Sequence, residues 1–123
     1  MDKVYGMHEV ELRSGVKGED FEKFFGEEYA PSFQPEGTWT VHLIKGDRGA
    51  RAGKYLVMYE IASVEERDRY VQASGTPSTA VQQELEPSPA TAAWQKIAEQ
   101  WKKFAAKVPG IDDIYTDYVE VAL

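Results

Sequence analysis

The chain contains no cysteine, which excludes disulfide bonds, thiolate metal ligands and a cysteine nucleophile. Basic residues are scarce relative to acidic ones, since 14 Lys and Arg stand against 21 Asp and Glu, for a net charge of −7. A surface of that sign opposes binding to the phosphate backbone of nucleic acids, which needs a basic face. We therefore expect no nucleic-acid partner.

Long apolar runs are also absent, and no apolar segment follows the first residue. We therefore expect a soluble, cytoplasmic protein with no membrane partner. Histidine is rare, and the two histidines, His8 and His42, fall on separate predicted strands. With only scattered carboxylates around them they give no tetrahedral or facial ligand set, so the sequence predicts no metal site and no cofactor. Haem bound through either histidine stays open, although an aromatic-filled core leaves little room for it.

The chain does have enough apolar material for one folded domain. Its 123 residues, 42% of them hydrophobic, fit a single domain over residues 1–123. The central stretch is residues 53–70, GKYLVMYEIASVEERDRY. It predicts a strand over residues 54–62 that leads directly into a helix, because Ser63 and Glu66 fit a capping box. We expect that helix to reach about Tyr70.

The N-terminal half gives alternating strand and helix signals. Residues 4–13 alternate in polarity as a strand does, and residues 19–29 carry bulky aromatics at helical spacing. We expect Pro31 to end this helix, because the residue before a proline avoids the helical region. A β-branched and aromatic run over residues 38–44 predicts a second strand, and the glycine-rich residues 45–53 predict a hairpin loop.

The hairpin sequence KGDRGARAGK is not a phosphate-binding P-loop. Arg48 stands where the pattern needs glycine, and Tyr55 replaces the required Ser or Thr. A strand follows the loop, whereas a P-loop opens a helix. Its basic residues are either a solvated hairpin surface or a clamp for an anion at the tip.

The C-terminal half contains the least regular segment and the longest helix. Residues 73–89 hold three prolines and many small polar residues, and we expect at most two helical turns there. A helix over residues 89–108 is predicted to be capped by Ser88 and stopped by Pro109. One apolar stripe runs along it: Trp94, Ile97, Trp101, Phe104 and Val108. Residues 114–122 predict a final strand.

The element order is β-α-β-β-α-(α)-β. Two split β-α-β units with right-handed crossovers give an α+β fold, an antiparallel sheet with helices on one face, which is the ferredoxin-like arrangement. Strand parity divides the third strand into two sets. Tyr55, Val57, Tyr59 and Ile61 form one set, which we expect to face the helices, and Leu56, Met58 and Glu60 form the other. Both sets are mostly apolar, so we expect a second copy of the chain to cover the face without helices.

The element order, the length and the stretch YEIASVEERDRY resemble the dimeric α/β-barrel superfamily. The resemblance covers nearly the whole chain in the order of its elements, and its motifs are a strand followed by Ser-x-x-Glu and a long final helix. It implies a homodimer in which two ferredoxin-like sheets pack face to face. Members include cofactor-independent monooxygenases, muconolactone isomerases, haem-handling enzymes, polyketide cyclases and stress-responsive proteins, so fold alone does not choose an activity.

Within that superfamily the chain is most similar to the stress-responsive barrel branch, which includes plant polyketide cyclases. The matching residues are His8 in MHEVEL, the pair Phe24 and Phe25 in EKFFGEEY, and Tyr70, seven residues after Ser63. In the cyclases such residues line a pocket between the sheet and the helices. A second pocket histidine expected after the tyrosine is absent, because the matching region reads ASGTPST.

His8 is the leading catalytic candidate. A neutral imidazole in an aromatic pocket can act as a general base or orient an oxyanion, and the alternative is a structural histidine bonded to a backbone carbonyl. Tyr70 or Tyr59 would then supply the orienting hydroxyl. The expected ligand-binding residues are Phe24, Phe25, Tyr29, Val57, Trp94 and Trp101. Without a cavity, these aromatic residues are simply core.

Two further polar residues have less definite roles. We expect His42 to be a structural or surface residue near a sheet edge. Glu60 is a lone acid on an apolar strand face, so it must be paired or protonated if it is buried. Arg13, or a basic residue of the second subunit, is the expected partner, and a catalytic carboxylate inside the barrel is the alternative.

These observations lead to two hypotheses about function. The first is a small-molecule-binding barrel protein with a pocket for an aromatic or polyketide-like compound and, if it is an enzyme, cofactor-free acid–base chemistry of the cyclase, isomerase or monooxygenase type. The second is a non-catalytic homodimer for stress response or ligand sequestration, whose aromatics fill the core. An open volume that touches His8 and Tyr70 would favour the first hypothesis.

Overall fold

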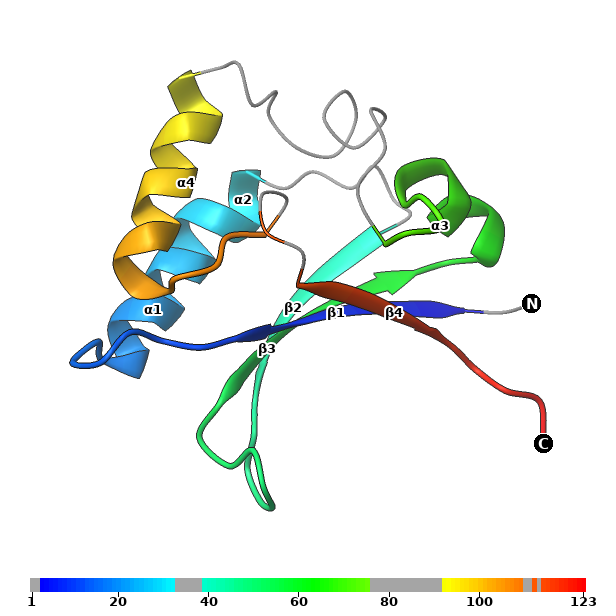
Figure 1. The fold of residues 1–123 in the computed structure, drawn as a ribbon, viewed down its shortest axis with the longest axis horizontal. Coiled ribbons are helices and arrows are strands. Elements are labelled where there is room, and N and C mark those ends of the chain that lie inside the picture. The colour runs from blue at the N-terminus through cyan, green and yellow to red at the C-terminus, as the bar shows by residue number, and fades with distance from the viewer. Residues whose placement is uncertain (1–2, 33–38, 76–91, 110–111, 113) are drawn as a thin grey trace.

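The computed structural model describes residues 3–32, 39–75, 92–109, 112 and 114–123 (Figure 1). The helical turns expected within residues 73–89 and the helix cap expected at Ser88 lie outside these ranges.

The described residues form an α+β domain built on one four-stranded sheet. The spatial order of the strands is β2-β3-β1-β4, and every neighbouring pair is antiparallel. The strands are β1 (Val4–Val10), β2 (Trp39–Lys45), β3 (Tyr55–Ile61) and β4 (Tyr115–Val119). This arrangement confirms the expected fold class and is compatible with a ferredoxin-like fold.

The helices all lie on the same face of the sheet (Figure 1). The N-terminal helical segment consists of α1 (Gly18–Phe24), a π-helical turn η1 (Phe25–Tyr29) and α2 (Ala30–Ser32). The other two helices are α3 (Val64–Tyr70) and α4 (Ala92–Phe104). Among the described residues, none of these helices has the length and apolar character that crossing a membrane requires.

The prediction that Pro31 ends the first helix is wrong, because the helical path continues to Ser32. The chain widens to a π-turn before the proline, and the N–H of Ala30 bonds to the carbonyl of Phe25. Pro31 then falls in α2, near the end of this continuous helical path and two residues after the π-turn. The π-turn also changes which side chains of this segment face the sheet.

The junction between β3 and α3 forms as the sequence predicts. Ser63 is the N-cap, and its Oγ accepts a hydrogen bond from the backbone N–H of Glu66 at 3.2 Å. A cap of this kind stabilises a helix by about 1 kcal/mol. Because α3 has only seven residues, this contribution matters for fixing where the helix begins.

Two predicted boundaries are wrong for one shared reason. The helix α4 ends at Phe104, not before Pro109, and the regular part of β1 ends at Val10, short of residue 13. Beyond these ends, Leu12 forms an isolated β-bridge with Ala105. The backbone N–H of Arg13 donates to the carbonyl of Phe104 at 2.8 Å, and its guanidinium Nε donates to Lys102 at 2.7 Å. The residues after β1 therefore donate hydrogen bonds to the carbonyl groups at the C-terminal end of α4.

Strand parity sorts the two faces of β3 as expected. Its side chains facing the helices are exposed by at most 5%, whereas those on the opposite face are only half-buried. The helix-facing set is Tyr55, Val57, Tyr59 and Ile61. The core between sheet and helices is unusually aromatic, with Phe21 and Trp101 at its centre (5.4 Å between ring centroids).

Candidate functional site

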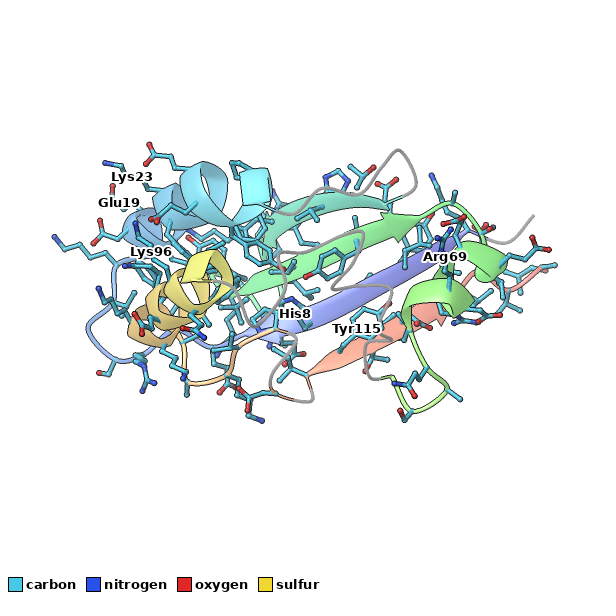
Figure 2. The ribbon with its side chains drawn as sticks, turned by 90° about the horizontal axis from the view of Figure 1, so that it is seen from above. His8, Glu19, Lys23, Arg69, Lys96 and Tyr115 are labelled. Atoms are coloured by element: carbon cyan, nitrogen blue, oxygen red, sulfur yellow. The ribbon has the colours of Figure 1, made fainter. Side chains whose placement is uncertain are left out.

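His8 lies on the helix-covered face of the sheet, near its middle. On β1 it sits opposite Val57 of β3 and Tyr115 of β4, and its exposed fraction is 3%. Figure 2 looks onto this face and shows His8 and Tyr115 between the end of the sheet covered by α4 and the end covered by α3. Alternation along β1 turns His8 inward, and the neighbouring strands hold it there.

A chain of hydroxyl groups is bonded to the His8 ring. Its Nε2 lies 3.1 Å from the hydroxyl of Tyr59, and that hydroxyl lies 2.9 Å from the hydroxyl of Tyr29. The three residues come from β1, β3 and η1, so the contacts join the sheet to the first helical segment. The structural alternative for His8 predicts a backbone carbonyl as its partner, whereas the observed partner of Nε2 is the hydroxyl of Tyr59.

Burial lowers the pKa of His8 from 6.5 to about 4. Taking an imidazolium ion out of water is costly, and no carboxylate contacts the ring among the described residues to offset that cost. At neutral pH His8 is therefore an uncharged imidazole with one protonated and one unprotonated ring nitrogen. The described residues also contain no cluster of His, Cys, Asp or Glu that could hold a metal ion.

The expected aromatic lining gathers around this chain. Trp101 lies 5.2 Å from Tyr29, 5.6 Å from Phe24 and 6.5 Å from Phe25, measured between ring centroids. These residues and Val57 are all buried in the same core. The side chains of the two remaining predicted residues, Tyr70 and Trp94, lie outside the described part of the structure.

A hollow of about 420 Å³ reaches His8 at one edge of the sheet. Beyond the pair His8–Tyr115, β1 is no longer paired with β4, and the hollow lies at this point. The residues that follow α4 form its other side. Its walls include His8, Ala105 and Ile114. Met7, Leu56, Thr116 and Tyr118 come from the face without helices, so the hollow spans the edge of the sheet. The hollow thus touches His8, and the expected contact with the Tyr70 side chain lies outside the described residues.

Sequence reasoning missed a second polar cluster next to this site. The hydroxyl of Tyr115 donates to Asp117 at 3.2 Å, and the guanidinium of Arg67 donates to the other oxygen of the same carboxylate at 2.7 Å. The ring of Tyr115 lies 6.4 Å from that of Tyr59. Burial and the charge of Asp117 raise the pKa of Tyr115, so its hydroxyl keeps its proton.

A signal for this cluster is present in the final strand. In IYTDYVEV, Tyr115, Asp117 and Val119 share one strand face, and an acid on that face calls for a buried partner. Gly6 is the other signal, because a glycine inside a strand often marks a close approach. A Cβ at this position would lie 2.5 Å from the Tyr115 hydroxyl oxygen. Gly6 thus makes room for the Tyr115 ring on the sheet.

A second hollow of about 630 Å³ lies between the end of α3 and β4. Arg67, Val71, Tyr115 and Asp117 are among its lining residues. The Arg67 guanidinium is also bonded to Asp68 at 2.8 Å, so two carboxylates already neutralise it. This side of the sheet is therefore polar but offers no excess positive charge from Arg67.

The face without helices carries Glu60, whose partners differ from the prediction. Arg13 is bonded to the end of α4, and Glu60 contacts Lys3 at 3.3 Å and His42 at 3.2 Å. The Glu60 side chain is 32% exposed, so it is a half-buried member of an ion-pair cluster. His42 lies on β2, which is an edge strand, as expected.

The hairpin loop between β2 and β3 also agrees with the sequence. A strand follows it, which excludes the P-loop geometry. Arg51 pairs with Glu9 at 3.2 Å, and Lys45 lies over the ring of Tyr55 at 5.5 Å. These two basic side chains are therefore engaged within the chain.

Comparison of the chain with protein-family models, with curated proteins and with solved structures found no match. The functional argument therefore rests on the geometry of the site.

Proposed function

We propose that the protein is a homodimeric small-molecule-binding protein of the dimeric α/β-barrel type. Its ligand site is the His8–Tyr59–Tyr29 chain with the hollow beside it, and its ligand is an aromatic or polyketide-like compound. If the protein is an enzyme, the same site carries out cofactor-free acid–base chemistry. The observation that carries the proposal is a neutral, buried histidine that is bonded to two hydroxyls and reached by an open hollow.

The chemistry of this site favours polar recognition inside an apolar pocket. Imidazole and phenol groups can each donate and accept a hydrogen bond, so the chain can adapt its protons to a bound polar group. The surrounding rings of Phe24, Phe25 and Trp101 give the low-polarity environment in which such bonds are strongest. Both features suit a flat aromatic compound that carries a few oxygens.

The second copy of the chain is proposed to cover the face without helices. Six largely apolar side chains of that face are incompletely buried: Tyr5, Met7, Ile44, Leu56, Met58 and Tyr118. Met7, Leu56 and Tyr118 also line the hollow, so the second copy would lie at its rim. Two ion pairs, Lys3–Glu60 and Arg51–Glu9, lie beside them and balance in charge, although the whole chain carries −7. A face of balanced charge can meet its own copy across a two-fold axis without like-charge repulsion.

One observation favours the alternative, a non-catalytic homodimer for stress response or ligand sequestration. The aromatic core is densely filled, and Phe21 and Trp101 are almost completely buried. A ligand that reaches His8 must therefore lie in the hollow and can place only a small polar group among these rings.

Binding of 2-naphthol, followed by NMR of the ¹⁵N-labelled protein, tests the site. We expect shifts at His8, Ala105 and Ile114, and an affinity at least ~10-fold weaker in the His8→Gln variant, since a lost hydrogen bond and a changed cavity act together. The His42→Gln variant is the matched control and should bind like the wild type. Absence of binding to the folded wild type would exclude this ligand site.

Mass measurement by sedimentation at several concentrations tests the homodimer. We expect a dimer that the Met58→Lys substitution converts to a monomer, because a lysine charge would be buried at the centre of the contact. Gln95→Lys, on the exposed surface of α4, adds the same charge elsewhere and should stay dimeric. A wild-type protein that is monomeric at all concentrations would contradict the barrel.

A further inference from the structure

Two buried ring nitrogens in the core have no hydrogen-bond partner among the described residues. They are Nδ1 of His8 and Nε1 of Trp101, in side chains that are 3% and 1% exposed. More than nine in ten buried polar groups in folded proteins are bonded, and an unsatisfied one destabilises the folded state. One small polar group between these neighbouring rings would satisfy both atoms, and it must extend past His8 from the hollow, whose lining includes His8 and Ala105 but not Trp101.

The Trp101 nitrogen can only donate, because the indole Nε1 always carries its hydrogen. The role of the His8 nitrogen follows from the other side of its ring. Nε2 meets the hydroxyl of Tyr59 at 3.1 Å. A phenol is a much better proton donor than a neutral imidazole, and an imidazole nitrogen is a much better acceptor than a phenol oxygen.

The favoured arrangement is therefore a directional chain. Tyr29 donates to Tyr59, and Tyr59 donates to Nε2 of His8, over distances of 2.9 and 3.1 Å. The ring proton of neutral His8 must then lie on Nδ1. Both unpartnered nitrogens are N–H donors in this arrangement, and their rings lie 6.3 Å apart between centroids.

We propose that His8 Nδ1–H and Trp101 Nε1–H form a donor pair that binds one carbonyl oxygen of an aromatic ketone. This inference rests on the proposed function and assigns the ligand chemistry of the same site. It changes the role expected of His8, which becomes a hydrogen-bond donor to the ligand, where the sequence had suggested a general base. Tyr29 and Tyr59 become positioning residues, because they act by fixing the tautomer of His8.

The surroundings of the site favour a neutral carbonyl over a charged oxygen. The hollow at His8 is lined by Glu9, which is paired with Arg51, and by Glu11 and Lys107. These groups give no excess of positive charge that would hold an anionic phenolate or carboxylate, and the chain as a whole carries −7. The low pKa of His8 agrees with a donor role, because a ring that stays neutral at pH 7 can hold its Nδ1 proton without charge. A neutral histidine that polarises a carbonyl is an established use of this side chain.

The tautomer is tested directly by ¹⁵N NMR of the histidine ring in the wild-type protein at pH 7. We expect His8 Nδ1 to be protonated and Nε2 to be unprotonated. In the Tyr59→Phe variant the preference should weaken or reverse, because the donor to Nε2 is gone. A wild-type His8 protonated on Nε2 would overturn the inference while leaving the proposed ligand site intact.

The ligand chemistry is tested with acetophenone and ethylbenzene, which have similar size and differ in the carbonyl. We expect acetophenone to bind about 3- to 10-fold more tightly, the range given by one or two neutral hydrogen bonds. Its addition should shift the N–H signals of His8 and Trp101, and ethylbenzene should not. Equal affinities would mean that a trapped water, and no ligand oxygen, satisfies the two donors, which overturns the inference.

Substitution of Trp101 separates hydrogen bonding from packing. Trp101→Phe keeps an aromatic ring and removes Nε1–H, so it should lower the preference for acetophenone about 2- to 5-fold, as expected for one neutral hydrogen bond, and leave ethylbenzene binding unchanged. Phe104→Leu alters the same aromatic cluster without removing a donor, and it should keep the preference. If neither compound binds the folded wild type, the proposed function fails and the inference fails with it. If both bind without preference, only the inference fails.

Discussion

The two histidines of the chain lie on opposite faces of one sheet and have opposite surroundings. His8 faces the helices, is 3% exposed and bonds to a hydroxyl. His42 faces away from the helices, has a side chain that is 39% exposed and contacts the carboxylate of Glu60. Around His8 the first face holds its polar groups in a neutral chain, and the Arg67–Asp117 ion pair lies beside Tyr115 on the same face. On the second face the charged groups are paired and partly exposed to solvent.

This difference shows that residue type alone does not give a role. The same imidazole is held neutral where aromatic rings surround it, and lies within an ion-pair cluster where carboxylate and ammonium groups are at hand. The histidine of the proposed ligand site lies on the first face. The proposed contact between copies of the chain, which needs apolar area with balanced charges, uses the second.

The largest expected effect is a pH dependence of stability that comes from His8 alone. Its pKa is about 4 in the folded protein and 6.5 in the unfolded chain, so the unfolded chain binds more protons between these values. The contribution is full above pH 6.5 and is lost as the pH falls to about 4. At about 1.4 kcal/mol for each pH unit, the loss in the free energy of unfolding is about 3 kcal/mol.

Denaturant unfolding of wild type and His8→Gln at a series of pH values measures this term. The difference between the two curves should change by about 3 kcal/mol between pH 7 and pH 4, since all carboxylates are common to both proteins. A His8→Gln profile parallel to that of the wild type would show that burial does not hold His8 neutral.

A smaller effect is expected from removing one hydroxyl on the helix-covered face. Tyr59→Phe leaves both His8 Nε2 and the Tyr29 hydroxyl without this partner, so we expect a loss of about 2 kcal/mol in unfolding free energy. Tyr118→Phe makes the same change on the other face, where the ring is 55% exposed in the single chain, and at protein concentrations low enough to give monomer it should cost close to nothing. Equal losses for the two variants would contradict the contrast between the faces.

Next in size is the effect of a single added methyl group at Gly6. Gly6→Ala places a Cβ 2.5 Å from the Tyr115 hydroxyl oxygen, so the Tyr115 ring must move and its bond to Asp117 must change. We expect a destabilisation of about 1–2 kcal/mol, at the lower end of the cost of overpacking. Thermal unfolding and the NMR shifts of Tyr115 measure it.

Gly26→Ala is the matched control for this substitution. A Cβ at Gly26 meets nothing within 4 Å, and the residue lies in the helical turn η1 with a negative φ. Replacing a helical glycine by alanine stabilises by roughly 0.5–1 kcal/mol, so the two variants should change stability in opposite directions. A neutral Gly6→Ala would mean that the Tyr115 ring is free to leave the sheet.

The sequence predicted the fold wherever the signal was local. Alternation gave the faces of β3, and Ser63 gave the start of α3, because each depends only on neighbouring residues. The ends of β1 and α4 were missed because they are set by Leu12 and Ala105, which are distant in the chain and pair across the domain. No local pattern encodes that contact.

The site was predictable to a similar extent. His8 was identified as an inward polar residue on a strand, and aromatic spacing brought Phe24, Phe25 and Trp101 to the same core. The partners of His8 could not be read from the sequence, because the hydroxyl of Tyr59 is 51 residues away and the π-turn that places Tyr29 has no sequence signature. The Arg67–Asp117 pair depends in the same way on the pairing of β4 with β1.

The smallest expected effect distinguishes a free face from a covered one. Glu60→Gln removes the charge shared by Lys3 and His42, whose side chains are 49% and 39% exposed. Ion pairs this exposed contribute about 0–1 kcal/mol and weaken with salt, so an uncovered face predicts a small loss that vanishes at about 1 M salt. If a second copy covers the face, water is excluded and the screening is weaker. Unfolding of Glu60→Gln at low and high protein concentration, each in low and high salt, separates the cases. We expect the loss to grow with protein concentration and to persist in salt, and a loss independent of both would show that the face stays open to solvent.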